Sequence, residues 1–221
     1  MLMNYLYANF LEEETFVTTN NLTKEALSAL TRACVFPAAS YVYTSKGSSV
    51  SFVSSFSEDA TYRFHLKGHS RWLESVVQLE LTTEDHARQH FFSRYGDAKR
   101  TFYTSGLGQQ LSEFAPDIKT QFDSDHANAT WGHFLNGVYG VCTRDGQPET
   151  VFKKQALVMY IEQMTTKGSA SSSQAKLQLL ERAVTALDEV ESDFAPHEVS
   201  QTSRQRCIID VRANILAKKP A

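Results

Sequence analysis

Histidine offers the most chemistry in this chain, and two of its seven histidines stand four residues apart in a helical pattern. This spacing places His86 and His90 on one helix face, where two imidazoles can hold a zinc ion. The helical zinc-protease motif needs Glu directly after the first His, and Ala87 stands there. The pattern favours a polar flank of a core helix. We predict no metal and no cofactor, with His86 and His90 as the candidate ligands if a metal does bind.

Two further groups of polar residues could serve a metal. His65 and His69 have the same four-residue spacing, but a Gly lies between them in an expected strand-to-helix turn. That geometry does not fix both imidazoles on one side. The acidic stretch DSDHAN at 123–128 lacks the EF-hand spacing, and Ca²⁺ takes about six to eight oxygen ligands. A solvated loop of turn-forming residues explains it better.

Nucleophilic chemistry has one apparent pair, Cys142 and His133. Nine residues apart on one helix, their side chains would start roughly 13 Å apart along the axis and face opposite sides. Cys142 is therefore interpreted as a small buried apolar residue. The stretch TSGLGQQ at 104–110 lacks the preceding strand and third Gly of a phosphate loop. We assign no catalytic residue, and whether the protein is an enzyme stays open, with a non-catalytic protein favoured.

The overall composition limits the partners. Apolar residues make up 42% of the chain, charged residues 21%, and the net charge is −3, which is ordinary for a globular protein. Nucleic-acid binders are usually basic, so nucleic acid is not expected as a partner. Three widely spaced cysteines indicate reduced thiols rather than a disulfide scaffold. No apolar run reaches the roughly 18 residues that cross a bilayer, so we expect a cytoplasmic protein with no membrane partner.

Apolar periodicity predicts the elements that would position any site. Helical spacing at 2–12 and 23–32 is followed by alternation over 40–56, with a turn at Lys-Gly-Ser-Ser. Helix, helix and hairpin is the order of a winged helix-turn-helix module. From residue 70 onward the periods are helical. The predicted fold class is mainly α, a helical bundle with a small N-terminal winged-helix-like module that contains a β-hairpin.

The expected organisation has four parts. The winged-helix-like module spans 1–57 and a helical domain spans 58–165. A Ser-rich linker at 166–174 leads to a C-terminal helical pair at 175–221.

The densest stretch of the chain runs from residue 129 to residue 161. Gly132, Gly137 and Gly140 fall within an apolar helical pattern, where each Gly costs about 1 kcal/mol relative to Ala. Such glycines usually permit close approach by another backbone, which favours a tightly packed central helix. The alternative interpretation is a groove lined by polar side chains, namely His133, Asn136, Tyr139 and Arg144.

The N-terminal module suits a peptide better than DNA. A DNA-reading helix presents Arg, Lys, Asn or Gln to base edges, and this one offers only Lys24 and Arg32, with Glu25 between them. The same architecture can take an extended peptide as an added strand at the hairpin edge. The predicted set for peptide or partner binding is Tyr41, Tyr43, Val50, Phe52, Trp131, His133, Tyr139 and Arg144.

Two stretches, ACVFPAASYVY (33–43) and WGHFLNGVYGVCTRDGQPETVFKKQAL (131–157), resemble a bacterial family of unknown function. It is domain of unknown function number six-zero-five-eight, whose members are often labelled natural-product biosynthesis proteins. The resemblance covers about residues 1–165, with a shortened first segment. It carries no established activity, but it implies a small protein beside enzymes that make or modify a peptide. The matching residues are Pro37, Ser40, Tyr41, Val42, Trp131, Tyr139, Gly140, Val141, Cys142, Pro148, Glu149 and Lys154.

These observations yield one favoured function and two alternatives. The favoured function is a non-catalytic accessory or partner protein in bacterial peptide natural-product biosynthesis, which binds a peptide or a partner enzyme. One alternative is a winged helix-turn-helix DNA-binding regulator, which would need a basic stripe. The other is a metal-dependent enzyme that uses His86 and His90 with a third ligand brought in by the fold.

Overall fold

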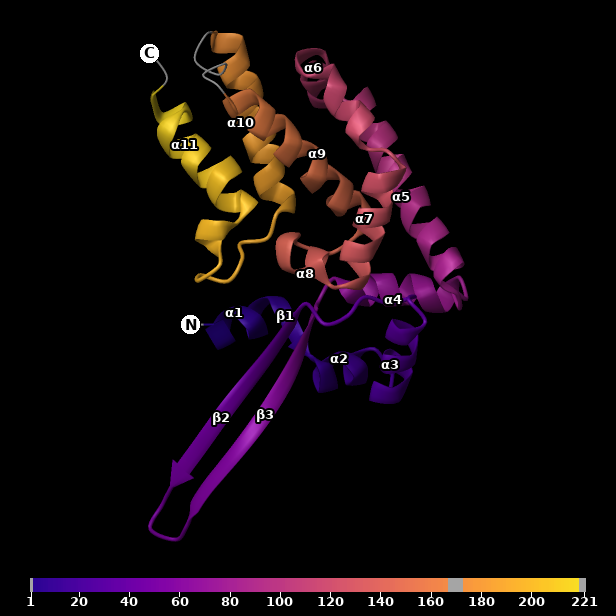
Figure 1. Ribbon diagram of the computed structural model, residues 1–221, viewed down its shortest axis with the longest axis vertical. Helices are drawn as coiled ribbons and strands as arrows, with labels where there is room; N and C mark the ends of the chain where they lie inside the picture. The colour runs from indigo at the N-terminus through magenta and orange to yellow at the C-terminus, as the bar shows by residue number, and fades with distance from the viewer. Residues whose placement is uncertain (1, 167–172, 219–221) are drawn as a thin grey trace.

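The computed structural model describes residues 2–166 and 173–218, and it confirms a mainly helical protein with a small β-hairpin module (Figure 1). The N-terminal part contains α1 (Leu2–Asn9), β1 (Phe10–Glu12), α2 (Glu13–Thr19), α3 (Lys24–Arg32), β2 (Tyr41–Val50) and β3 (Ser55–Leu66). Next come α4 (His69–Gln78), α5 (Glu84–Thr104), α6 (Gly106–Phe114), the 3₁₀ helix η1 (Pro116–Gln121), α7 (Ser124–Leu135), α8 (Val138–Cys142) and α9 (Pro148–Thr165). The C-terminal part contains α10 (Gln174–Val190), η3 (Val199–Gln201), the π-helical η4 (Arg204–Ile209), α11 (Asp210–Asn214) and η5 (Leu216–Lys218).

Local sequence signals explain where several helices begin. The side chain of Thr23 accepts a hydrogen bond from the backbone N–H of Ala26 and caps α3, as the sequence predicts. Thr83 and Asp123 cap α5 and α7 in the same way. Such caps satisfy backbone donors that have no partner within the helix, and each contributes about 1 kcal/mol. Pro148 occupies the first turn of α9, where its missing N–H costs nothing.

The sheet is antiparallel with the strand order β1-β3-β2. β2 pairs with β3 along its whole length, from Tyr41 opposite Phe64 to Val50 opposite Ser55. The short β1 pairs only with the base of β3. Most of the hairpin is therefore a two-stranded ribbon, and Figure 1 shows it projecting away from the helices.

The hairpin is longer than the sequence predicts. The Lys-Gly-Ser-Ser turn expected at 46–49 is part of β2, and the turn lies at 51–54, where Ser51 N–H donates to the carbonyl oxygen of Ser54 over 2.9 Å. The second strand, β3, runs to Leu66, beyond the alternation expected over 40–56. The boundary expected after residue 57 consequently falls inside β3. The stretch is rich in serine and has little alternation of apolar and polar residues. The sequence pattern therefore does not show where β2 ends and the turn begins.

The two faces of the ribbon have different surroundings. One face carries Tyr41, Tyr43 and Phe64, and it packs against α1 in a small core built around Leu6 and Phe10. The opposite face carries residues such as Val42, which lies across from Arg63, and it is turned toward α2 and α3. Alternation of side chains along a strand separates these two faces.

The main core lies among α4, α5, α7, α9 and α10. Four aromatic rings meet at its centre: those of Trp72, Phe91, Trp131 and Phe134, with centroid separations between 4.8 Å and 6.1 Å. The indole Nε1–H of Trp72 donates to the carbonyl oxygen of Val35 over 2.9 Å. α4 therefore joins the N-terminal module to the helical body.

The C-terminal helices belong to the same core. α10 packs along α9, and its buried residues include Leu180, Val184 and Leu187. An isolated antiparallel bridge joins Thr143 to Glu191 at the end of α10. Most of the predicted Ser-rich linker, residues 167–172, lies outside the described residues. Within 2–166 and 173–218, no helix combines the length and the apolar character that a membrane crossing would require.

Candidate functional site

The outer edge of β2 is a free sheet edge within the described chain. Because the strand order is β1-β3-β2, β2 has a strand neighbour on one side only within the described chain. Alternate backbone N–H and C=O groups of an edge strand point away from the sheet and can pair with another chain. β2 offers such an edge over ten residues.

The distal half of the hairpin also exposes apolar side chains. Val50, Phe52 and Val53 are 83%, 102% and 75% exposed, and Phe56 follows on β3 at 59%. Val42, near the base of β2, is 57% exposed. A contiguous run of exposed apolar residues at the end of a projecting ribbon is typical of a contact surface for another molecule.

The hairpin residues predicted to bind a partner divide into two groups. Val50 lies at the end of β2, and Phe52 lies in the turn, so both are available to a partner. Tyr41 and Tyr43 lie on the face that packs against α1, and both are half-buried. The hydroxyl of Tyr41 donates to Glu198 Oε2 over 2.6 Å, so it anchors the base of the hairpin to the C-terminal segment.

The predicted contact surface around Trp131, His133 and Tyr139 is not an open groove. Trp131 is 3% exposed, and its indole N–H donates to Glu84 Oε1 over 2.8 Å. Tyr139 is buried too, and its hydroxyl accepts a 2.8 Å hydrogen bond from Gln155 Nε2. Only His133 is exposed. An apolar stripe on a helix is compatible with a contact surface or with burial in the core. In this fold Trp131 and Tyr139 are buried.

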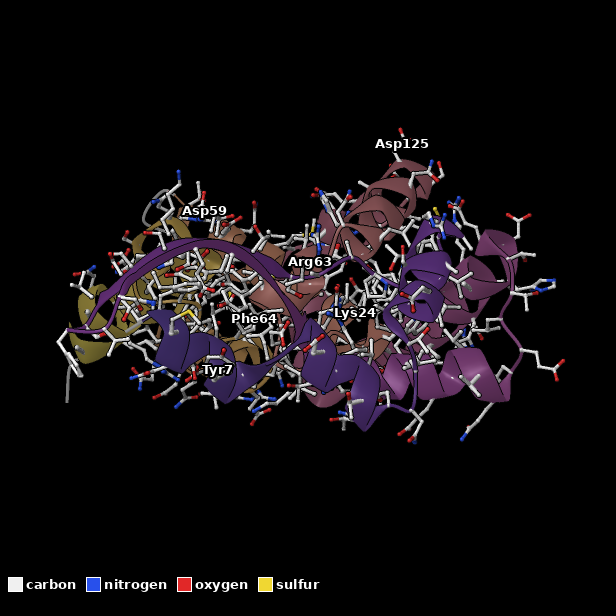
Figure 2. The ribbon with its side chains drawn as sticks, turned by 90° about the horizontal axis from the view of Figure 1, so that it is seen from below. Tyr7, Lys24, Asp59, Arg63, Phe64 and Asp125 are labelled. Atoms are coloured by element: carbon white, nitrogen blue, oxygen red, sulfur yellow. The ribbon has the colours of Figure 1, made fainter. Side chains whose placement is uncertain are left out.

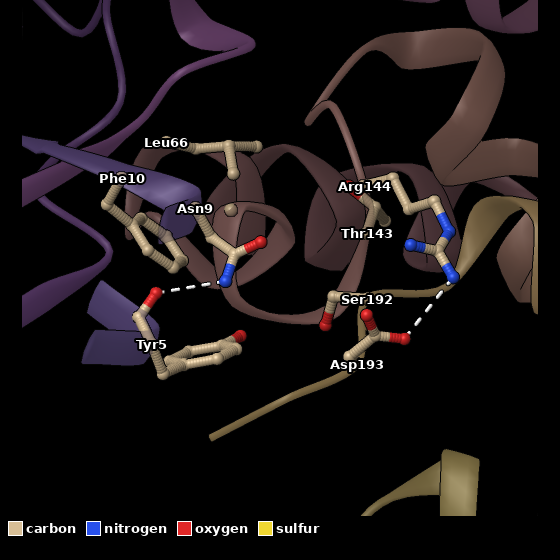
Figure 3. Close-up of a pocket in the computed structure, with 9 residues that line it drawn as sticks. Tyr5, Asn9, Phe10, Leu66, Thr143, Arg144, Ser192 and Asp193 are labelled. Carbon is tan, nitrogen blue, oxygen red and sulfur yellow. Dashed lines mark hydrogen bonds and ion pairs between the residues drawn. The ribbon is translucent and has the colours of Figure 1, made fainter. Parts of the chain in front are cut away.

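Arg144 lies beside a small polar pocket between α1 and the segment that follows α10 (Figure 3). The pocket has a volume of about 60 Å³, and Tyr5, Asn9 and Ser192 are among its lining residues. The guanidinium of Arg144 donates to the carbonyl oxygen of Asp188 and to Asp193 Oδ1, the latter over 3.3 Å. Its Nε and Nη2 donors are thus used within the chain, and the pocket lies where separate elements of the fold meet.

The glycines of the dense stretch have different roles. Gly137 has a φ of +72°, and a Cβ there would lie 2.7 Å from the carbonyl oxygen of Ala38. Gly140 packs directly against Ser40. Gly132 has open space around it. The first two permit close approach of the segment before β2, as predicted, and Gly132 does not.

The histidines do not assemble a metal centre in the part of the chain that the structure describes, where no group of three or more potential ligands occurs. His86 is exposed on α5, whereas His90 is half-buried with its ring 5.6 Å from that of Trp72. His65 and His69, which the spacing alone did not place on one side, both pack against Phe36. Burial lowers the pKa of each of these two imidazoles, so both favour the neutral form.

Cys142 and His133 do not form a nucleophile–base pair. Contrary to our expectation, they do not share one helix, because α7 ends at Leu135 and Cys142 ends α8. Cys142 is buried in the core, and His133 is exposed on α7. Burial raises the pKa of the Cys142 thiol, which keeps it protonated and unreactive.

Lys154 takes part in a buried polar cluster that sequence reasoning missed. Its Nζ lies 3.8 Å from Glu191 Oε1, and the same carboxylate accepts a hydrogen bond from the hydroxyl of Ser203. Glu191 is completely buried, and burial raises the pKa of its carboxyl. The three residues come from α9, the end of α10 and the start of η4, so the cluster fastens the C-terminal part to the body. Polar residues this far apart in the chain give no sequence signal for such a contact.

The model of a family of unknown function, DUF6058, matches residues 87–216, which is more than half of the chain. The match reaches into the C-terminal helices, beyond the limit at residue 165 that the resemblance suggested. It does not include the 33–43 stretch. Neither a curated protein nor a solved structure matches the chain.

Proposed function

The chain belongs to the DUF6058 family of unknown function, and we propose that it is a non-catalytic binding protein that takes an extended peptide segment as an added strand at the edge of β2. The observation that carries the proposal is the ten-residue outer edge of β2, which has no strand partner among the described residues. Backbone pairing at such an edge gives affinity without requiring a particular sequence.

The exposure of the ribbon supports this function further. A two-stranded hairpin is marginally stable by itself in water, and exposed apolar residues at its end add a cost in solvent. Val50, Phe52 and Val53 could be covered by a partner that lies along or across the distal hairpin. A third strand would also widen the ribbon into a sheet, which is a more stable arrangement.

The base of the hairpin is fixed to the helical part of the protein. Tyr41 anchors the base of β2 to Glu198, and the base of β3 pairs with β1. The base of the hairpin is therefore fixed on two sides, while its distal half stays exposed.

We extend the proposal to a biological setting. The resemblance to proteins labelled for natural-product biosynthesis suggests that the bound segment is a peptide that bacterial enzymes make or modify, or a strand of such an enzyme. The supporting argument is chemical: an added strand holds a peptide extended, with its side chains pointing to alternate faces and open to a second protein.

A shortened hairpin tests the function. Residues 46–59 are all exposed, and Ser45 lies opposite Ala60, so an Asn-Gly turn can join these two residues directly. We expect peptides selected from a random library on the full-length protein to bind the shortened protein at least tenfold more weakly in fluorescence anisotropy. Circular dichroism should give the same melting temperature for both proteins. Equal affinities, or a library that yields no binding peptide, would contradict the proposal.

A further inference from the structure

A hollow of about 310 Å³ lies at the base of the hairpin, between α3 and the face of the ribbon that carries Val42. We call it the basal hollow. Its polar lining includes the side chains of Lys24, Ser28 and Arg32 from α3, Arg63 and His65 from β3, and Glu13 from α2. Figure 2 shows Lys24 and Arg63 near one another at this place, with Asp59 farther along the ribbon.

The cations of the basal hollow are only partly neutralised. Lys24 Nζ forms a 2.6 Å ion pair with Glu14 Oε1 at the exposed rim. Arg63 forms no ion pair with any residue of the described chain. Arg32 donates only a 3.4 Å hydrogen bond from Nε to the carbonyl oxygen of Ser28 in its own helix. A guanidinium carries five N–H donors in a planar fork. The guanidinium groups of Arg63 and Arg32 therefore have donors left that can bind an anion.

A buried imidazole, that of His65, also lines the hollow and is 2% exposed. Its Nε2 lies 3.5 Å from Glu13 Oε2, and its Nδ1 has no hydrogen-bond partner. In the neutral ring that burial favours, donation from Nε2 to Glu13 leaves Nδ1 as an acceptor that only a hydrogen-bond donor can satisfy. A bound carboxylate is therefore held by the arginines and not by His65.

The basal hollow adjoins the free edge of β2. Val42 lies opposite Arg63 across the ribbon and on the same face as His65. A strand added beside β2 would lie roughly 5 Å farther out, and every second side chain would point to this face. A side chain of such a strand beside Val42 would therefore point to the face of the ribbon that lines the basal hollow.

We propose that the basal hollow binds the carboxylate of an Asp or Glu side chain on the peptide strand taken up by β2. This inference rests on the proposed function and specifies its ligand as an acidic peptide. A nucleic-acid backbone fits less well, because Glu13 lines the hollow, and Glu12, Glu14 and Glu25 lie near Lys24 and would repel a chain of phosphates. A single carboxylate brings one negative charge to this place, where a nucleic-acid backbone brings one with every phosphate.

The test compares two acetylated and amidated hexapeptides, Thr-Val-Thr-Glu-Thr-Val and the version with Gln in place of Glu. Sodium acetate and a DNA duplex serve as further probes. Binding is followed by the shifts of the Arg63 and Arg32 Nε–Hε signals and of the β2 amides in nuclear magnetic resonance. The variant is Arg63→Gln. The matched control is Lys46→Gln, which removes a positive charge from the same face of the ribbon, farther from the base.

We expect the Glu peptide to shift both arginine signals and to bind at least fivefold tighter than the Gln peptide. Arg63→Gln should abolish this difference, and Lys46→Gln should leave it intact. Equal binding of both peptides without arginine shifts would overturn the hollow as a carboxylate site and leave strand addition standing. Another outcome is that acetate shifts the arginine signals while neither peptide shifts the β2 amide signals. That result would support the carboxylate site in the basal hollow and overturn strand addition. No response to any carboxylate, or a response to DNA alone that falls steeply with salt, would overturn both.

Discussion

Gly140 lies directly against Ser40, and there is no room for a methyl group between them. The contact joins α8 to the segment that leads into β2, and the backbone N–H of Ala38 donates to the carbonyl oxygen of Leu135 over 2.8 Å close by. The two sequence stretches that resemble one family, 33–43 and 131–157, thus meet in space. Their shared role in the fold is to hold the base of the hairpin against the helical body.

Substitution of the glycines tests this packing. Gly140→Ala should lower the free energy of unfolding by about 1–3 kcal/mol, because a Cβ would overlap Ser40 and lie 3.2 Å from His69 Cε1. Gly132→Ala is the matched control: it has open space, and the lower entropy of the unfolded chain should stabilise the protein by about 0.5–1 kcal/mol. Urea denaturation measures both changes. Equal effects at the two positions would show that α8 does not pack closely on the segment before β2.

The anchor of the hairpin base is the hydrogen bond from Tyr41 to Glu198. Tyr41→Phe should lower the free energy of unfolding by about 1 kcal/mol, since a partly exposed hydrogen bond to a carboxylate is lost. Tyr43→Phe is the control, because the Tyr43 hydroxyl has no hydrogen bond to a described residue. The same denaturation experiment compares them. A cost for Tyr43→Phe as large as that for Tyr41→Phe would argue against the anchor.

The buried His69 makes stability depend on pH. Burial lowers its pKa from 6.5 to about 3, so between these values the unfolded chain binds more protons than the folded protein. The free energy of unfolding should therefore fall as the pH falls below 6.5, by about 2 kcal/mol from this group between pH 6.5 and 4.5.

The comparison of His69→Gln with the wild-type protein isolates that contribution. The variant should show a shallower fall in the free energy of unfolding between pH 6.5 and 4.5. His86→Gln, at an exposed position, should keep the wild-type slope. Parallel curves for the wild-type protein and His69→Gln would mean that His69 is protonated in the folded protein.

The exposed end of the hairpin should be dispensable for folding. Phe52→Ser combined with Val53→Ser should change the free energy of unfolding by less than about 0.5 kcal/mol, because both side chains are already in solvent. The affinity for selected peptides should fall if these residues are covered on binding. A large loss of stability would show instead that the tip packs on another part of the chain.

Several features of the fold could be predicted from the sequence because their signals are local. Thr23 begins a helix after a turn, and Pro148 begins another, as capping chemistry requires. The apolar stripe of residues 131–141 predicted one central helix packed by its neighbours. Trp131 and Phe134 do lie in the core, but the helix is broken at Gly137, whose φ of +72° separates α7 from α8.

The features that the sequence could not reveal depend on contacts between distant residues. The ion pair between Lys154 and Glu191 joins α9 to the residue that follows α10, and no local pattern marks either residue as the partner of the other. The basal hollow combines Arg32 with Arg63, from a helix and a strand that meet only in the fold. The length of the hairpin was also hidden, because a Ser-rich segment has no apolar alternation that distinguishes strand from turn.

The most direct test of strand addition is amide hydrogen exchange along β2, with and without a peptide selected on the full-length protein. Amides that already bond to β3 should exchange slowly in both states. The alternate amides between Tyr41 and Val50 that face outward should become at least tenfold more protected when the peptide is bound. Outward amides that exchange at the same rate at saturating peptide would contradict the account.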